Sequence, residues 1–157
     1  MENKYRYIVC GVVQKDDQIA LGKKAKGQAP YPDFWHTPGG GVEDQDRAKI
    51  LFDCRDFDNS YFHEELQREI GEELGIAITD IHCIVPKYRS EPRQGETVDK
   101  TGNRTHYFFL EYLCHYVGGE LKPGDDLAQV QWVKKSDLQN IPLTPPSKDL
   151  YTELRWM

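Results

Sequence analysis

The chain has 157 residues, about the size of one ordinary domain, and we expect a single domain over residues 1–157. Its 20 lysines and arginines are outnumbered by 26 aspartates and glutamates. The resulting net charge of −6 argues against general nucleic-acid binding through a basic face. No apolar run has the length of a membrane span or a secretory signal, and the four scattered cysteines form no CxxC pair. We therefore expect a cytoplasmic protein with neither membrane association nor a structural zinc site.

The chain opens with the pattern of a β-hairpin and continues into a glycine turn. β-Branched and aromatic residues over 5–14 are separated by a short polar turn from a second apolar run over 19–22. The loop over 23–42 then closes in Pro-Gly-Gly-Gly at 38–41. Because glycine has no side chain, this turn lets the backbone approach a ligand or a metal ion closely.

A polar stretch and a helix follow the glycine turn. Residues 44–59 are polar apart from the apolar triplet at 50–52. The helical periodicity of residues 60–75 predicts a helix with Ser60 as its N-cap and Gly75 as its C-terminal stop.

The second half of the chain predicts more strands than helices. Residues 81–87 indicate a strand, 88–105 a long polar loop and 106–116 a strongly aromatic strand. The remaining predicted elements are a strand over 130–134, a short helix from Ser136 and a C-terminal helix over 147–156. This order predicts a layered domain of the α/β class.

The helix predicted over 60–75 carries its acids on one side. Glu69, Glu72 and Glu73 lie within an arc of about 100°, and Glu65 joins them one turn earlier. Each such pair of carboxylates repels by roughly 0.2–0.5 kcal/mol, and Arg68 offers the nearby opposite charge. A divalent cation would reverse this repulsion, and carboxylate oxygens suit Mg²⁺ or Mn²⁺. From charge alone, an acidic face that simply contacts solvent remains the alternative.

The order of residues on this helix matches a known motif. Residues 68–76, REIGEELGI, fit the second half of the Nudix box, R-E-(apolar)-x-E-E-x-G-(apolar), at every defined position. A chance match in a chain of this size has a probability on the order of 10⁻⁵. The chain thus resembles the Nudix hydrolase family, and the likeness extends to residues 35–43 and loosely to 119–133. The resemblance implies an α/β/α sandwich with a mixed β-sheet.

The front half of the box departs from the family pattern. Counted from the second glycine of the turn, Asp46 stands where a glutamate is expected, and 21 residues instead of seven separate it from Arg68. An insertion at about 46–59 therefore interrupts the box. Its first glutamate is missing or replaced by Asp46 or Glu43, and counting back from Arg68 puts Ser60 at its position. A loop insertion costs little closure entropy, so the fold can survive it.

The apolar triplet of the insertion suggests a contact surface. We expect Ile50, Leu51 and Phe52 to pack over the site or against a second subunit, which leaves a homodimer open.

The resemblance also implies a reaction. Nudix enzymes hydrolyse a nucleoside diphosphate linked to another group X, using Mg²⁺ or Mn²⁺ to bind the pyrophosphate and activate the attacking water. By this resemblance Glu72 and Glu73 ligate the metal, Glu69 ligates it or acts as the base, and Arg68 orients a carboxylate. Further oxygen ligands are expected from the glycine turn and from a later loop, where the candidates are Gly39, Gly40, Glu120, Asp125 and Asp126.

Two other functions remain open alongside hydrolysis. The interrupted box favours a Nudix-fold sensor or scaffold that binds a nucleotide without cutting it, and the complete set of Glu69, Glu72 and Glu73 argues against that function. An isomerase of diphosphates is weaker, since no paired Cys and Glu signature supports it.

Substrate contacts are expected from two basic loops, with a small nucleotide or nucleotide-like diphosphate as the partner. Three lysines precede the glycine turn, and we take Lys23 and Trp35 as candidates for phosphate contact and base stacking. Residues 87–106 hold five basic side chains against three acids, a local reversal of the overall charge that could steer a polyanion. From this loop we take Arg89 and Arg104 as substrate-binding candidates.

Overall fold

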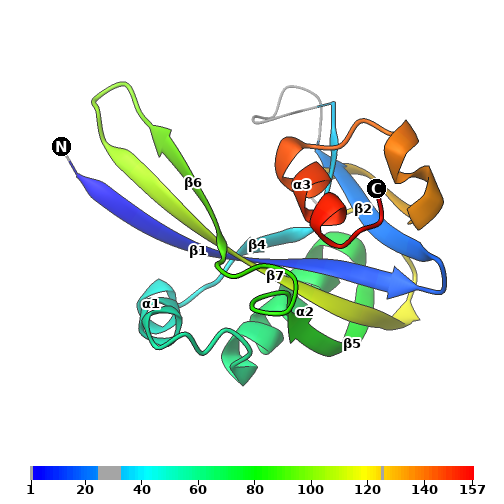
Figure 1. The fold of residues 1–157 in the computed structure, drawn as a ribbon, viewed down its shortest axis with the longest axis horizontal. Coiled ribbons are helices and arrows are strands. Elements are labelled where there is room, and N and C mark those ends of the chain that lie inside the picture. The colour runs from blue at the N-terminus through cyan, green and yellow to red at the C-terminus, as the bar shows by residue number, and fades with distance from the viewer. Residues whose placement is uncertain (1, 25–32, 125) are drawn as a thin grey trace.

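The computed structural model describes residues 2–24, 33–124 and 126–157, and within them the strands form one mixed sheet with helices on both faces (Figure 1). The predicted opening hairpin is confirmed as β1 and β2. The strands are β1 Asn3–Lys15, β2 Gln18–Lys24, β3 Trp35–His36, β4 Gly39–Gly41, β5 Ile76–Cys83, β6 Arg93–Val98, β7 Arg104–Gly119 and β8 Leu127–Lys134.

The two longest strands, β1 and β7, form the centre of the sheet. They run parallel, while the other strand pairs are antiparallel, and the main path is β3-β2-β1-β7-β5. β2 pairs with β1 at two positions only, Gln14 opposite Ile19 and Lys15 opposite Gln18. The edge of β1 that β2 leaves free then pairs with β4. Strands β2 and β4 therefore diverge from a common neighbour, which opens a space beside the glycine turn.

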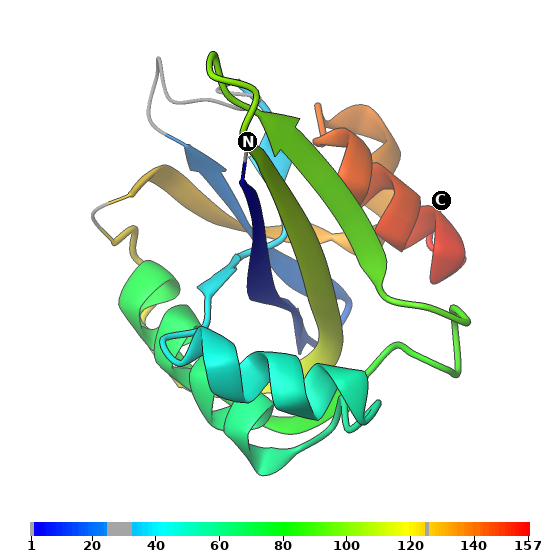
Figure 2. The same ribbon diagram turned by 90° about the vertical axis from the view of Figure 1, so that its left-hand side faces the viewer.

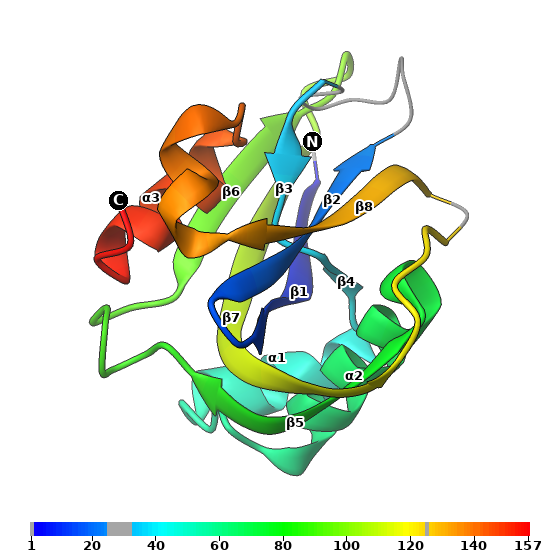
Figure 3. The same ribbon diagram turned by 90° about the vertical axis from the view of Figure 1, so that its right-hand side faces the viewer.

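The helices cover opposite faces of this sheet. Views from two sides place α1 and α2 together on one face and α3 on the other (Figures 2 and 3). This arrangement confirms the predicted α/β/α sandwich. No helix within the described ranges is long and apolar enough to cross a membrane. The helices are α1 Gln45–Asp53, α2 Ser60–Leu74, the 3₁₀ helix η1 Lys135–Asn140 and α3 Pro145–Glu153.

Helix α2 forms where its periodicity predicts it and differs only at its first turn. The Asn59 side chain accepts from the Tyr61 amide, so Asn59 and not Ser60 is the N-cap. Gly75 ends the helix at φ 73°, a left-handed conformation that glycine adopts without strain. One stripe of α2 is fully buried against the sheet; it consists of Phe62, Leu66, Ile70 and Leu74. Burial of this stripe leaves the acidic side of α2 facing the glycine turn.

The insertion forms a helix of its own. The Asp44 side chain caps α1 by accepting from the Arg47 amide. Phe52 contacts the rings of Tyr7 and Phe108 at centroid distances of 5.2 and 4.9 Å, so this part of the triplet packs into the core. The expectation that the triplet packs over the site is therefore wrong for Phe52, while Ile50 is 65% exposed and its packing against a second subunit stays a prediction.

Two other expected elements differ from the prediction. β5 begins at Ile76, directly after α2, whereas the sequence pattern favoured 81–87. The loop expected over 88–105 contains β6, a polar strand that pairs along β7 from Arg93 opposite Phe109 to Val98 opposite Arg104. The hydrogen bonds to β7 make β6 a strand, and its exposed polar side chains carry no apolar pattern that could have predicted it.

Candidate active site

The glycine turn brings backbone against both the sheet and α2. Gly39 and Gly40 lie opposite Cys10 and Val9 of β1. A β-carbon added at Gly39 would collide with the Val9 carbonyl, and one added at Gly40 would collide with the Glu69 carboxylate. Glycine is therefore required at Gly39, where the obstacle is backbone, whereas at Gly40 the Glu69 carboxylate would have to move; this approach places the predicted backbone ligands next to the acids of α2.

The four predicted residues of α2 meet at this turn. Arg68 Nη1 lies 3.1 Å from both Glu69 Oε1 and Glu72 Oε2. Glu73 points to the turn as well, since its Oε2 accepts from the Gly39 amide at 3.3 Å. The structure thus brings Arg68, Glu69, Glu72 and Glu73 together around one short segment of backbone.

The negative charges of these carboxylates exceed the single positive charge of Arg68 beside them. Burial, reinforced by the nearby Glu69 carboxylate, raises the pKa of Glu73 to about 7. Burial also raises the pKa of Glu69, and the neighbouring Arg68 only partly opposes this. Each shift means that the folded chain resists ionising these side chains, as expected for a site that is completed by a cation.

The donor set suits a hard divalent cation. Carboxylate and carbonyl oxygens are the ligands that Mg²⁺ and Mn²⁺ take, and this site offers both. Within the described residues, no three His, Cys, Asp or Glu side chains surround a single point, because Arg68 draws Glu69 and Glu72 to itself. The chemistry of the donors fits a metal ion that competes with Arg68 for these oxygens.

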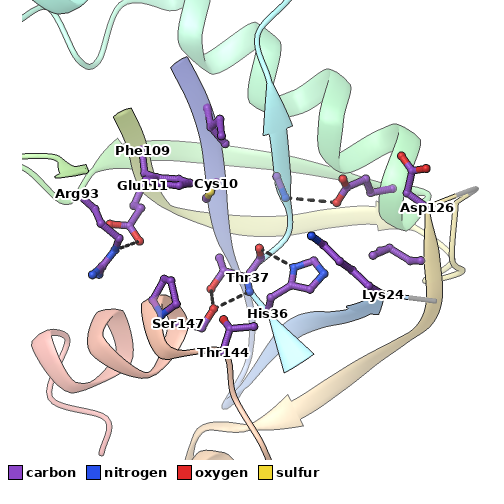
Figure 4. Close-up of a pocket in the computed structure, with 15 residues that line it drawn as sticks. Cys10, Lys24, His36, Thr37, Arg93, Phe109, Glu111, Asp126, Thr144 and Ser147 are labelled. Carbon is purple, nitrogen blue, oxygen red and sulfur yellow. Dashed lines mark hydrogen bonds and ion pairs between the residues drawn. The ribbon is translucent and has the colours of Figure 1, made fainter. Parts of the chain in front are cut away.

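A pocket of about 440 Å³ opens beside this site, in the space between the diverging strands (Figure 4). Its size is in the range of small-molecule sites. Arg93 and Glu111 lie on one side and Asp126 on the opposite side, while the side chain of Lys24 reaches toward the middle. Glu73 and Gly39 form part of the wall, which places the acids of α2 at the edge of the pocket. The apolar part of the lining comes from Ile8, Cys10, Phe109, Leu127 and Pro146.

Polar groups from β3 and α3 line another part of the pocket. Thr37 is hydrogen-bonded to two residues of α3. Its amide donates to Ser147 Oγ at 2.9 Å, and its hydroxyl lies 2.7 Å from the Tyr151 hydroxyl. Beside it, His36 Nδ1 lies 3.0 Å from the Thr37 carbonyl, and burial lowers the pKa of His36. Its Nε2 is buried and has no hydrogen-bond partner among the described residues. A neutral His36 therefore offers an unused polar atom at the pocket.

The loop after β7 reaches the site because it is bound to the end of α2. The Gly124 amide donates to the Glu73 carbonyl at 2.8 Å, and the Lys122 amide to the Leu74 carbonyl at 3.0 Å. Asp126 consequently lines the pocket. Of the other two predicted ligands in this loop, Glu120 is exposed and is not part of the lining, and Asp125 lies outside the described residues.

The predicted substrate-binding side chains are not part of the pocket lining. The Lys23 ammonium sits 5.9 Å from the centre of the Trp35 ring, and neither residue contributes to the lining. Arg89 is bound by Glu111 and Glu153, and Arg104 pairs with Glu96 on the sheet.

Two other basic residues line the pocket instead, Lys24 and Arg93. Successive side chains of a strand point to opposite faces, so the structure brings Lys24 to the pocket in place of Lys23. Arg93 similarly takes the place proposed for Arg89.

Sequence reasoning also missed Glu111, Thr37 and Ser147. Glu111 is a lone acid inside the aromatic strand β7, and that mismatch was a usable signal, since a buried charge needs a partner. Thr37 and Ser147 are ordinary polar residues 110 positions apart, and no local pattern links them.

Known proteins resemble this chain over most of its length. A model of the NUDIX domain matches residues 4–154. Nucleoside triphosphatase NudI of Klebsiella pneumoniae (strain 342) is 26% identical over 145 residues, which cover 92% of this chain and 93% of the relative. NudI of Escherichia coli O17:K52:H18 is 27% identical over 135 residues and covers 86% of each chain.

Solved structures support the fold. The MutT NUDIX hydrolase from Burkholderia pseudomallei superimposes with a TM-score of 0.66 at 23% identity, covering 96% of this chain and 98% of that one. The MutT protein from Bacillus halodurans gives a TM-score of 0.65 at 19% identity, covering 94% and 80%. The shared fold spans both layers of helices.

Proposed function

The chain belongs to the NUDIX hydrolase family, and from this premise we propose that it cleaves the pyrophosphate bond of nucleoside diphosphates linked to a further group. Members of this family are generally metal-dependent pyrophosphohydrolases. The observation that supports the proposal best is the meeting of Glu69, Glu72 and Glu73 with the glycine turn at the edge of a pocket.

The proposed roles follow from where each side chain lies. Glu72 and Glu73 would hold a divalent ion together with a carbonyl of the glycine turn. The ion, when bound, neutralises phosphate oxygens and lowers the pKa of water. Glu69 lies against Gly40 and would take the proton of the water that attacks phosphorus. Arg68 orients Glu69 and Glu72.

The pocket would hold the nucleoside part of the substrate. Phe109 and Ile8 offer apolar surface for a flat base, and His36 Nε2 offers an unused polar atom to its edge. Lys24 lies close enough to Glu73 to lower its pKa, which puts a positive charge where phosphates would meet the metal site.

A hydrolysis panel tests this function. It comprises nucleoside triphosphates, because the NudI relatives are named for them, and nucleotide sugars, ADP-ribose and dinucleoside polyphosphates, each with Mg²⁺ and with Mn²⁺. We expect turnover of at least one class with release of a nucleoside monophosphate or phosphate product, and none after metal removal with EDTA. The matched variants are Glu72→Gln, which should lose at least about 100-fold in kcat/KM, and Glu64→Gln on the exposed side of α2, which should not.

A sensor that binds without cutting is the second candidate, and the interrupted box favours it. Asp46, at the expected position of the first glutamate, is exposed in the first turn of α1. Tight nucleotide binding without hydrolysis across the whole panel would support the sensor and contradict the enzyme. Unchanged turnover in Glu72→Gln would show that the site is wrongly assigned.

A further inference from the structure

Because of the insertion, no glutamate stands at the position of the first glutamate of the box, ahead of the acidic helix α2. The structure shows what each substitute expected from the sequence does. Asp46 is exposed on α1, and Ser60 is exposed at the first position of α2. Glu43 lies 3.6 Å from Arg68 Nε, but its side chain is 74% exposed. None of the three holds Arg68 from a buried position.

Glu65 occupies that position instead. It is only 7% exposed, and its Oε2 accepts from Arg68 Nε at 2.9 Å. Its Oε1 accepts from the Glu43 amide at 2.6 Å and from the Tyr61 hydroxyl at 3.3 Å. A buried carboxylate is stable only when its oxygens are satisfied in this way. Glu65 is therefore fully engaged and unavailable as a metal ligand.

These contacts join the two halves of the site. Glu43 comes two residues after the glycine turn, so its bond to Glu65 anchors the turn to α2. Arg68, held by Glu65, reaches the Gly41 carbonyl at 3.5 Å as well as Glu69 and Glu72. The insertion lengthens the chain between turn and helix by 14 residues relative to the family pattern, so sequence proximity alone no longer holds them together.

We propose that Glu65 is a positioning residue that replaces the displaced glutamate of the box: it fixes the glycine turn to α2 and orients Arg68 so that Glu69, Glu72 and Glu73 can accept a divalent ion. This inference rests on the proposed function. Partners one step removed from a metal typically affect its affinity 10- to 100-fold when they are lost.

The test measures Mn²⁺ binding to the substrate-free protein, from the signal of free Mn²⁺ in electron paramagnetic resonance, beside thermal melting and steady-state kinetics. Glu65→Gln preserves the shape and removes the charge, and Glu65→Ala removes both. Glu64→Gln is the control, because it removes one negative charge from the exposed side of the same helix. We expect the Mn²⁺ dissociation constant to rise 10- to 100-fold in Glu65→Gln and kcat to fall with it, while Glu64→Gln stays within threefold of the wild type.

The outcomes separate this inference from the proposed function. A Glu65→Gln protein that melts earlier but binds Mn²⁺ like Glu64→Gln would show a purely structural role and overturn the inference, with the proposed function intact. A wild type that neither hydrolyses the panel nor binds Mn²⁺ would overturn both. If Glu65→Ala does not fold, Glu65→Gln alone decides between these results.

Discussion

Two clusters of charged side chains border the pocket, and they differ in charge balance. The α2 cluster consists of Glu65, Glu69, Glu72 and Glu73 around a single Arg68. The α3 cluster consists of Arg89, Arg93, Glu111 and Glu153, with two positive and two negative side chains, and the exposed Asp149 lies 3.6 Å from Arg93 at its rim. In the α3 cluster Arg89 donates to both carboxylates, and Arg93 Nε lies 3.2 Å from Glu111 Oε2. The first cluster has carboxylates in excess, and the second neutralises itself.

The pKa shifts of Glu73 and Glu153 show this contrast, whereas Glu65 of the α2 cluster has a lowered pKa because, despite its burial, it accepts hydrogen bonds from Arg68 and the Glu43 amide. Hydrogen bonding to Arg89 holds the pKa of Glu153 below its usual value, whereas burial raises the pKa of Glu73 to about 7. A self-neutralised cluster stabilises the folded chain without help, while an unbalanced one is tolerated where a ligand supplies the missing charge. Charge balance thus distinguishes a cluster that supports the fold from one that performs chemistry.

The largest expected effect separates activity from stability in the α2 cluster. Glu73→Gln removes a proposed metal ligand, so we expect kcat/KM to fall at least about 100-fold. The ionised Glu73 side chain destabilises the folded chain, so we expect no loss of thermal stability in metal-free buffer. Progress curves with Mg²⁺ and thermal melts in EDTA measure the two quantities. A variant that loses stability in parallel with activity would contradict the distinction between the clusters.

The α3 cluster should respond in the reverse way. Arg89→Met leaves Glu111 and Glu153 short of a partner, and we expect the free energy of unfolding to fall by about 3 kcal/mol. Arg104→Met is the matched control, since its pair with Glu96 is exposed and is worth less than about 1 kcal/mol. Urea unfolding gives both values. KM should stay within twofold in both variants, and a large rise in KM for Arg89→Met would restore its role in substrate binding.

The contributions of Glu153 and Glu73 to stability should depend on pH with opposite slopes. The pKa of Glu153 is lowered on folding, so its contribution, on the order of 1.5 kcal/mol, is present above about pH 4.5 and is lost as the pH falls. The pKa of Glu73 is raised, so metal-free protein loses stability as the pH rises from about 4.5 to about 7. Unfolding of Glu153→Gln, Glu73→Gln and wild type from pH 3 to 8 measures both differences. Equal slopes would remove the electrostatic contrast.

The smallest effect concerns neighbouring lysines. Lys24→Ala removes a positive charge from the pocket and should raise KM about three- to tenfold, whereas Lys23→Ala should leave it unchanged. The two variants lose the same charge from the same strand, so net charge cancels in the comparison. A rise in KM confined to Lys23→Ala would place the substrate on the other face of β2.

The site could be predicted from the sequence wherever its geometry is local. Glu69, Glu72 and Glu73 fall on one side of α2 because a helix repeats every 3.6 residues, and the glycine turn is readable because only glycine tolerates such an approach. The N-cap of α2 is Asn59, one residue before the predicted Ser60, and an error of one residue is ordinary for a predicted helix end.

The rest of the site depends on distant contacts. The alternation of Lys23 and Lys24 was visible in the sequence, but which of them faces the pocket is decided by how β2 leaves β1. Arg89 and Arg93 are both basic residues of one segment and both pair with Glu111 and Glu153, and only the packing of β6, β7 and α3 determines that Arg93 also lines the pocket.

By itself, then, the sequence determined the family, the acidic helix and the glycine turn, because each is encoded within a few consecutive residues. The tertiary structure decided that Glu65 holds Arg68 and that Glu73, Lys24 and Arg93 meet at one pocket. Those relations depend on the packing of α2, β1, β6 and α3, and burial and pairing of charges exist only once these elements are in place.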